Sequence, residues 1–345
     1  MQPGTYTALV TPFDDKGAVD EQGLDKLVSF QTENGITGIL AVGTTGESPT
    51  LNWEEHIRVI DFIAEKTRNR CICIAGTGSN NTAETLDATS HAVKAGCEAV
   101  LLVDPYYNGP SSLEIRKEYA APVAGAFPDI TVIPYVIPGR TGAQMFPEDL
   151  AILFNDHPNA RCVKEATANL DNMRRTRECC GPDFLIFSGD DGITYDMMTD
   201  PGIKGAGAIS VISNIAPAAA GAMVTSILNG NIDSAKKSFD GLKPLFDLVS
   251  VKTGEQTPYG EVSCKSRNPV PIKTLMQVLG MPSGPCRRPL GKMTRAGLNT
   301  VLEAARKVQT DSPWVFKPAA EFFGIDIEQR LNDPKFAEGL AYEDY

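Results

Sequence analysis

The feature that most constrains the fold is a regular alternation between short apolar runs and longer segments with helical spacing. The runs are continuous and rich in β-branched residues, a pattern typical of strands buried on both faces of a parallel sheet. Eight such runs occur in the first two thirds of the chain: Thr5–Val10, Gly38–Val42, Cys71–Ala75, Ala99–Val103, Thr131–Tyr135, Arg161–Lys164, Phe184–Ser188 and Gly207–Val211.

The segments between these runs carry helix start and stop signals. Asn52 precedes Glu55 by three residues, and Asn81 precedes Glu84 by three, so both pairs have the capping-box pattern. The second of these helices is expected to end at Gly96. Two more segments have a helical pattern: one around Leu24, Leu27 and Val28, and one over Ala216–Leu228.

Eight strands that are each followed by a helix predict a (β/α)8 TIM barrel over residues 1–230. A doubly wound open sheet is the alternative, but it usually has fewer strands, and no dinucleotide fingerprint follows the first strand. Helical patterns at about 231–250, 270–280 and 292–307 predict a small C-terminal appendage over residues 231–311. Residues 312–345 form an additional tail whose order the pattern does not determine.

Composition excludes several classes of function. The net charge of −11 argues against nucleic-acid binding, which needs clustered Lys and Arg. No apolar stretch reaches membrane-spanning length, and no secretory signal is present, so we expect a cytoplasmic protein. The eight cysteines include no Cys-x-x-Cys pair and the three histidines no His-x-x-x-His pair, so we expect reduced thiols and no metal site.

In a TIM barrel the active site lies at the carboxyl ends of the strands, so the residues that end each run are candidates. The second run ends in Gly43-Thr44-Thr45-Gly46-Glu47-Ser48. Its glycines permit a tight turn whose N–H groups can face a small anion. An ordinary polar turn explains the same residues equally well.

The fourth and fifth runs end in tyrosines. Tyr106 and Tyr107 follow the fourth, and Tyr135 ends the fifth, with Arg140 a few residues later in a Pro-Gly-Arg-Thr turn. Packing at the barrel rim and a solvated surface charge are the alternative interpretations.

The sixth run ends in Lys164 and Glu165, whose side chains must point to opposite sides of the strand. A lysine that faces the barrel interior loses hydration, which lowers its pKa and frees the amine as a nucleophile toward carbonyls. A lysine that faces the helical layer would instead extend to solvent. Spacing alone does not choose between the two orientations.

Taken together, these segments resemble the dihydrodipicolinate synthase/N-acetylneuraminate lyase family. The matching motifs occur in family order between about residues 4 and 308: Gly43–Glu47, Asp104–Tyr107, Tyr135 with Pro138–Thr141, Lys164–Thr167, Ser188–Asp191, Gly207–Val211 and Asn268–Lys273. The resemblance implies a class I aldolase-like lyase that needs no cofactor or metal.

The resemblance also implies a role for each matched residue. Lys164 would form an imine with pyruvate, and Tyr135 would act as general acid and base, in a proton relay with Thr45 and with Tyr107 from a neighbouring subunit. The remaining implied contacts are to the substrates: Thr44, Thr45 and Ile209 to the pyruvate half, and Arg140 to the carboxylate of the second substrate.

Two features favour the family members that condense pyruvate with L-aspartate-4-semialdehyde in lysine and diaminopimelate biosynthesis. These are the paired Thr44 and Thr45, and Arg140 after the tyrosine strand. Val136, where such members commonly carry Asn, is a departure, as are a longer segment near 248–267 and the tail. Three alternatives remain open: an aldolase for sialate or 2-keto-3-deoxygluconate, a hydratase-aldolase for aromatic pyruvates, and a non-catalytic keto-acid-binding paralogue.

The resemblance further implies a homo-oligomer, either a dimer or a dimer of dimers, and an allosteric site for lysine at its interface. The positions that match this site are Ser48, Trp53, His56, Asn80, Glu84 and Tyr106. Helix capping by Glu84 and rim packing of Tyr106 are the competing explanations for these residues.

Overall fold

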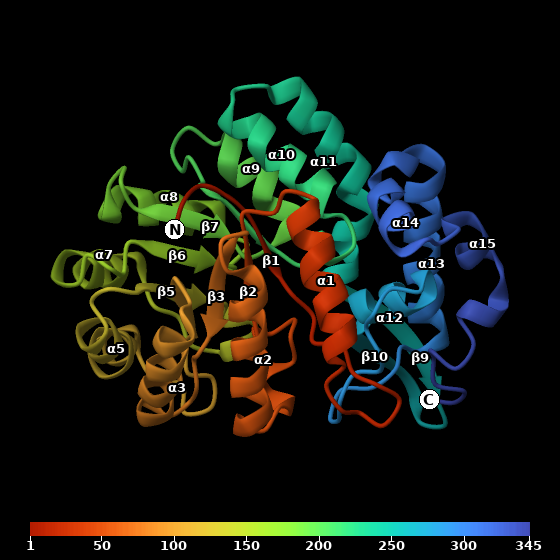
Figure 1. Cartoon of the computed structure of the whole chain (residues 1–345), viewed down its shortest axis with the longest axis horizontal. Coiled ribbons are helices and arrows are strands. Elements are labelled where there is room, and N and C mark those ends of the chain that lie inside the picture. Colours follow the sequence, from red (N-terminus) through yellow and green to blue (C-terminus); the bar gives the residue numbers. More distant parts are fainter.

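The computed structural model describes residues 1–345 and contains a closed barrel of eight parallel strands, as predicted (Figure 1). Each strand pairs with the next one along the chain, and β1 also pairs with β8. The strands are β1 (Gly4–Ala8), β2 (Gly38–Ala41), β3 (Ile72–Gly76), β4 (Ala99–Val103), β5 (Thr131–Val136), β6 (Cys162–Glu165), β7 (Leu185–Ser188) and β8 (Gly207–Ser210).

The seam that closes the barrel depends on glycine. Gly207 of β8 pairs with Gly4 of β1 and has a φ of 142°. A Cβ atom on Gly207 would lie 1.8 Å from the Gly4 carbonyl oxygen. No other residue could therefore occupy this position without moving β1 away from β8.

Alternation along the strands divides the apolar residues into two cores. Side chains that point outward pack against the surrounding helices in one large cluster. Those that point inward fill the barrel: Tyr6, Ala8, Leu40, Ile74, Ala99, Leu101, Ile133, Tyr135, Cys162, Phe187, Ala206 and Ile209. The interior is thus a packed core, and open space remains only at its ends.

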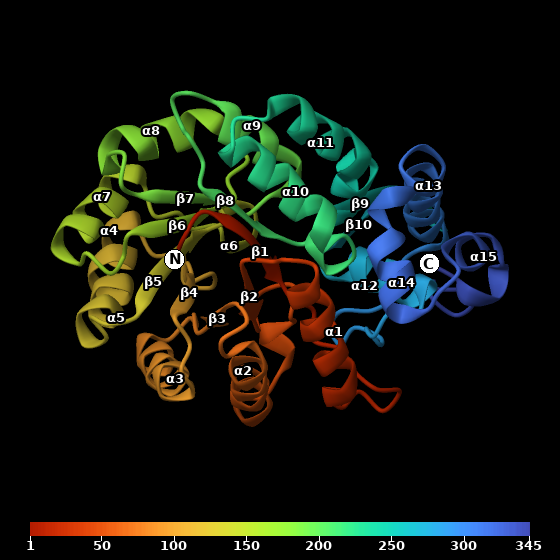
Figure 2. The same cartoon turned by 45° about the horizontal axis from the view of Figure 1, so that its top comes forward.

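Helices follow the strands, and most of them lie around the outside of the barrel (Figure 2). They are α1 (Glu21–Glu33), α2 (Trp53–Thr67), α3 (Thr82–Ala95), α4 (Ser112–Glu114), α5 (Ala121–Ala126), α6 (Pro138–Thr141), α7 (Pro147–Asp156), α8 (Leu170–Cys180), α9 (Thr194–Thr199) and α10 (Pro217–Leu228).

One of the two predicted capping boxes is present. At the start of α2, Asn52 and Glu55 cap each other's backbone N–H groups as predicted. The prediction for α3 is wrong, because Asn81 accepts from Ala83 N, and the Glu84 carboxylate accepts from the Ser79 hydroxyl instead. This helix does end at Gly96, which is in the left-handed conformation.

Beyond the barrel lie α11 (Ile232–Phe246), α12 (Val270–Leu279) and α13 (Arg295–Asp311), close to the predicted helices. The segment between α11 and α12 was not predicted to have structure. It forms an antiparallel hairpin of β9 (Ser250–Thr257) and β10 (Gly260–Arg267). Its strands are mostly exposed or half-buried, so they lack the apolar runs by which the barrel strands were identified.

The tail is ordered and contains α14 (Lys317–Phe323) and α15 (Ile327–Asn332). Phe322 and Phe323 of α14 pack on Phe30 of α1, with ring centroids 5.3 and 5.0 Å apart. Arg330 of α15 donates to the carbonyl oxygen of Val278 in α12. Both figures show these C-terminal elements together on one side of the barrel, beside α1 and α11.

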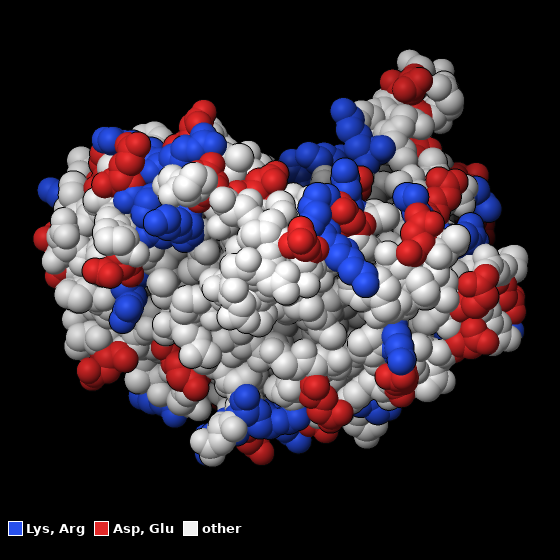
Figure 3. All heavy atoms as spheres, turned by 90° about the horizontal axis from the view of Figure 1, so that it is seen from above, with Lys and Arg blue, Asp and Glu red and all other residues white.

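The surface carries charges of both signs. Figure 3 shows them interspersed around the face seen from above, with a broad uncharged area at its centre over α10, which contains no charged residue. None of the helices combines the length and the apolar character that a membrane crossing requires.

Candidate active site

Lys164 lies near the carboxyl end of β6 with its side chain inside the barrel, so the interior orientation is the correct one. It is only 3% exposed, and its Nζ atom lies 4.2 Å from the centroid of the Tyr135 ring. Burial lowers the pKa of Lys164 to about 7, an effect that nearby Arg140 reinforces and Asp191 opposes. At this pKa about half of the Lys164 amine is unprotonated at pH 7. At the ordinary lysine pKa of 10.5, only about one molecule in three thousand would carry an unprotonated amine.

Glu165 points to the other side of the strand, as predicted, and does not neutralise Lys164. Its carboxylate accepts from Thr167 N and Asn172 Nδ2, at 2.7 and 2.6 Å. These bonds fix the chain immediately after β6. The ammonium form of Lys164 therefore has no carboxylate partner within hydrogen-bond distance, which favours the free amine.

Tyr135 lies directly beside Lys164, because the two residues are register partners in β5 and β6. Burial raises the pKa of its phenol to about 12, partly offset by Arg140 and the Thr44 hydroxyl. Tyr135 therefore carries its proton at neutral pH and can donate it to an oxygen formed next to Lys164.

Gly189 follows β7 and leaves space for the lysine stem. A Cβ atom there would lie 3.1 Å from Lys164 Cε and 2.8 Å from the Ala166 methyl group. This position belongs to the Ser188–Asp191 motif, but only the structure shows that its role is steric.

The turn after β2 places Thr44 and Thr45 at the same end of the barrel. Thr45 is buried, and its Oγ1 accepts from Asn268 Nδ2 at 2.9 Å. Thr44 is half-buried and lines the open space above Tyr135. Ile209 of β8 is buried inside the barrel.

A buried ion pair fixes this turn to the C-terminal appendage. Glu47, in the left-handed conformation at a φ of 57°, binds Lys273 of α12 at 2.6 Å, and both side chains are fully buried. Lys273 also donates to Thr11 O and Pro285 O, and the second Glu47 oxygen accepts from Arg287 N. Every strong donor and acceptor of the pair is satisfied, so the pair ties α12 to the loop that carries the threonines.

Arg140 lies in α6, a four-residue helix after β5. Its side chain reaches into the cavity while keeping contact with solvent, and partial desolvation lowers its pKa. Its Nη2 donates to the Asn268 carbonyl oxygen at 2.8 Å, which leaves Nε and Nη1 available for an anion. The orientation suits a carboxylate that enters above Tyr135.

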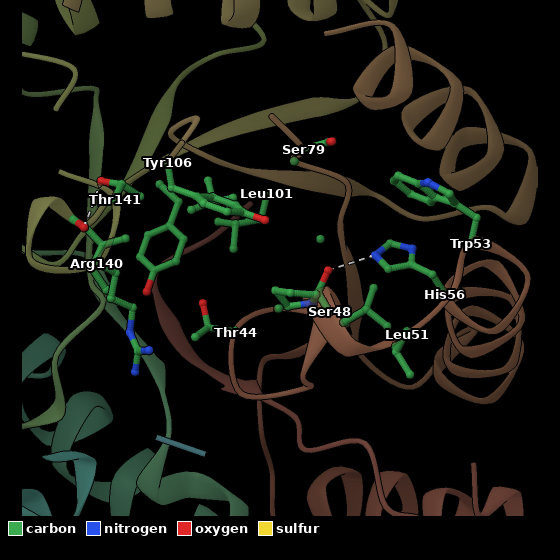
Figure 4. A pocket seen from close by; sticks show the side chains of 18 residues that line it. Thr44, Ser48, Leu51, Trp53, His56, Ser79, Leu101, Tyr106, Arg140 and Thr141 are labelled. Atoms are coloured by element: carbon green, nitrogen blue, oxygen red, sulfur yellow. Dashed lines mark hydrogen bonds between the residues drawn. The ribbon is translucent and has the colours of Figure 1, made fainter. Parts of the chain in front are cut away.

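Some of these residues line a cavity of about 390 Å³, whereas Lys164, Thr45 and Ile209 are not part of its lining. In Figure 4, Thr44 lies between Arg140 on one side and Ser48 and His56 on the other. The lining includes Thr44, Tyr135 and Arg140, and also four of the six predicted effector residues: Ser48, Trp53, His56 and Tyr106. Part of the predicted substrate site and part of the predicted effector site therefore line one continuous space.

Several of the predicted effector residues contact one another. Ser48 Oγ lies 3.2 Å from His56 Nε2, and the ring of Trp53 packs edge-on against His56. His56 is buried, and burial lowers its pKa to about 4, so the imidazole is neutral at pH 7. Asn80 Oδ1 accepts from the backbone N–H groups of Tyr106 and Tyr107, at 2.7 and 3.1 Å.

Tyr107 is not brought to the site within one chain. Its side chain is 84% exposed, on the turn after β4. Of the predicted relay residues, only Thr45 and Tyr135 lie at the mouth of this barrel. A role for Tyr107 thus requires a second copy of the chain, as the resemblance implied.

Three contacts around the site were not predicted. Asn268 binds Thr45, Gly189 accommodates Lys164, and the Glu47–Lys273 pair anchors the turn. All six residues stand in motifs that carried the resemblance. The motifs marked these positions, but the contacts join residues more than 200 positions apart in two cases, which no local pattern reveals.

Comparisons with known proteins agree with this geometry. Residues 1–308 match the model of the dihydrodipicolinate synthetase family. The chain is 39% identical over 293 residues to the 4-hydroxy-tetrahydrodipicolinate synthase of Methanococcus vannielii, covering 85% of this chain and 94% of the relative. It is 40% identical over 294 residues to that of Syntrophus aciditrophicus, with the same coverage.

Solved structures give the same result. The synthase from Methylacidiphilum fumariolicum SolV superposes with a TM-score of 0.82 at 32% identity, covering 94% of this chain and 99% of that one. A synthase from Cyanidioschyzon merolae, solved with lysine bound, superposes with a TM-score of 0.80 at 33% identity, covering 89% and 98%. The chain belongs to the dihydrodipicolinate synthetase family.

Proposed function

We propose that this chain has 4-hydroxy-tetrahydrodipicolinate synthase activity and condenses pyruvate with L-aspartate-4-semialdehyde in lysine and diaminopimelate biosynthesis. The observation that carries the proposal is the buried amine of Lys164, with its pKa lowered to about 7, beside the phenol of Tyr135. Relatives at about 39% identity that carry this activity in their names support the choice of reaction.

The chemistry begins at Lys164. Its neutral amine attacks the keto carbon of pyruvate, and loss of water gives an iminium ion. Tyr135, which carries its proton at neutral pH, donates to the departing oxygen. Loss of a methyl proton then gives the enamine, with the iminium nitrogen as the electron sink, so this step requires no cofactor.

The enamine carbon adds to the aldehyde carbon of the second substrate. The amine of that substrate then attacks the iminium carbon, which closes the ring and releases the amine of Lys164 unchanged. The ring nitrogen of the product thus comes from the second substrate and not from the enzyme. Arg140 holds the carboxylate of the incoming aldehyde through its free Nε and Nη1 donors. Thr44, Thr45 and Ile209 hold the pyruvate half.

Proton transfer passes through Tyr135 and Thr45, and through Tyr107 of a second copy of the chain. The exposure of Tyr107 supports this arrangement, because a large aromatic side chain on the surface is typical of an interface. We therefore propose a homo-oligomer, either a dimer or a dimer of dimers, that acts in the cytoplasm.

L-Lysine is the proposed feedback effector, bound by Ser48, Trp53, His56, Asn80, Glu84 and Tyr106. The lysine-bound relative supports this. The Glu84 carboxylate suits an α-ammonium group, and the ring of Trp53 suits an aliphatic stem. Asn80 already holds the backbone of Tyr106 and Tyr107, so an effector that engages Asn80 acts directly on the turn that carries the relay tyrosine.

The test is a coupled assay of the purified protein with pyruvate and aspartate semialdehyde. We expect turnover that requires both substrates and that is lost in Lys164→Arg, because a guanidinium stays protonated. Retro-aldol cleavage of sialate or 2-keto-3-deoxygluconate at a higher kcat/KM would assign the chain to the aldolases instead. Absence of turnover with every substrate would indicate a keto-acid-binding paralogue.

A further inference from the structure

The hairpin of β9 and β10 ends at the acceptor side of the site. Arg267, the last residue of β10, donates from Nη1 to the carbonyl oxygen of Gly139 at 2.9 Å. Gly139 immediately precedes Arg140 in α6. In return, Arg140 Nη2 donates to the carbonyl oxygen of Asn268, the residue after Arg267, at 2.8 Å. The base of the hairpin and α6 thus exchange two charge-assisted hydrogen bonds.

The helix α6 needs such support. It has only four residues, no side chain caps its N-terminus, and Gly139 and Arg140 are exposed. A single turn of helix is not stable without tertiary contacts. A carboxylate bound by two guanidinium donors demands a fixed orientation, so the contacts that hold α6 also decide how well Arg140 binds its ligand.

We propose that Arg267 is a positioning residue that holds α6 in place for Arg140, and that the β9–β10 hairpin is therefore a specificity element of the acceptor subsite. This inference rests on the proposed role of Arg140 as the ligand of the acceptor carboxylate. The proximity of two guanidinium groups adds to the effect, because their mutual repulsion is relieved when a carboxylate binds to Arg140.

The hairpin offers a matched control. Lys265 is two residues before Arg267, so its side chain lies on the same face of β10. It is exposed, faces Lys252 across the hairpin, and makes no hydrogen bond or ion pair. Like Arg267→Ala, Lys265→Ala removes one positive charge from β10, but it removes no contact to α6.

The experiment measures KM for each substrate, kcat, the rate of trapping the pyruvate imine with borohydride, and Tm. It uses full-length Arg267→Ala, Arg267→Lys, Lys265→Ala and Arg140→Ala. Arg267→Ala should raise KM for aspartate semialdehyde by about ten-fold, as expected for loss of one hydrogen bond from a charged group. KM for pyruvate and imine trapping should stay within about two-fold of wild type, since Arg267 does not reach that half-site. Arg267→Lys, which keeps a charged donor, should recover most of the loss, and Lys265→Ala should match wild type.

Four results would overturn the inference. An unchanged acceptor KM in Arg267→Ala, while Arg140→Ala raises it, would show that Arg140 is positioned without the hairpin. An equal rise in Lys265→Ala would show a general effect of charge. A fall in Tm with equal losses for both substrates would show a merely structural role. An unchanged acceptor KM in Arg140→Ala would refute the role of Arg140 itself, and with it this inference.

Discussion

The low pKa of Lys164 predicts a specific pH dependence for imine formation. Only the unprotonated amine attacks pyruvate. At low pyruvate concentration the rate of trapping by cyanoborohydride is therefore proportional to the fraction of Lys164 that is unprotonated. With a pKa of about 7, the neutral fraction is about one in eleven at pH 6 and about ten in eleven at pH 8. The trapping rate should therefore rise by about ten-fold between pH 6 and pH 8 and level off above pH 8.

The direction of the pKa shift of Lys164 follows from its burial. Burial penalises the ammonium form, so the folded protein releases this proton at lower pH than the unfolded chain would. An unshifted lysine predicts a different profile, with a rise of about a hundred-fold over the same two pH units and no plateau below pH 9. That profile would refute the argument. Arg140→Ala removes a positive charge that lowers the pKa of Lys164, so it should move the plateau to higher pH.

Three further predictions concern residues around the site. Lys273→Met leaves the buried Glu47 carboxylate without its charged partner, and urea unfolding should show a loss of about 3–5 kcal/mol, partly recovered by adding Glu47→Gln; an unchanged midpoint would contradict this. Gly189→Ala should reduce the rate of imine trapping by roughly ten- to a hundred-fold, because a displacement of about 1 Å at the reacting atom is enough for such a loss. Circular dichroism should show an intact fold. Trapping at the wild-type rate would show that the lysine stem has room to move. L-Lysine should inhibit the wild type but not Glu84→Ala; insensitivity of the wild type would remove the proposed effector, and an equally sensitive variant would place it elsewhere.

The parts of the structure that follow from local pattern were predictable. Barrel strands buried on both faces have continuous apolar runs, and all eight were located to within one or two residues of their observed ends. The hairpin of β9 and β10 was not located, because its strands are only partly buried and contain no continuous apolar run. The order of the tail depends on the packing of Phe322 and Phe323 on Phe30, some 290 residues earlier, which no local pattern encodes.

The features of the site were likewise predictable only where they follow from local pattern. Strand alternation gave opposite orientations for Lys164 and Glu165 but could not say which of them faced inward. The family motifs correctly indicated that Lys164 faces inward, and the structure shows that burial is the cause of its low pKa. Contacts such as that of Asn268 with Thr45 bring together residues from the appendage and from the turn after β2. They depend on how α12 and the hairpin pack on the barrel, so only the folded chain reveals them.

In our proposal, the buried amine of Lys164 is the nucleophile that binds pyruvate. The most direct measurement is reduction with borohydride in the presence of pyruvate, followed by mass spectrometry of the proteolytic peptides. We expect one pyruvate-derived addition on the peptide that contains Lys164, in step with the loss of activity. Lys273, which is equally buried but ion-paired with Glu47, should remain unmodified. Addition at any other lysine, or inactivation without addition, would contradict the account.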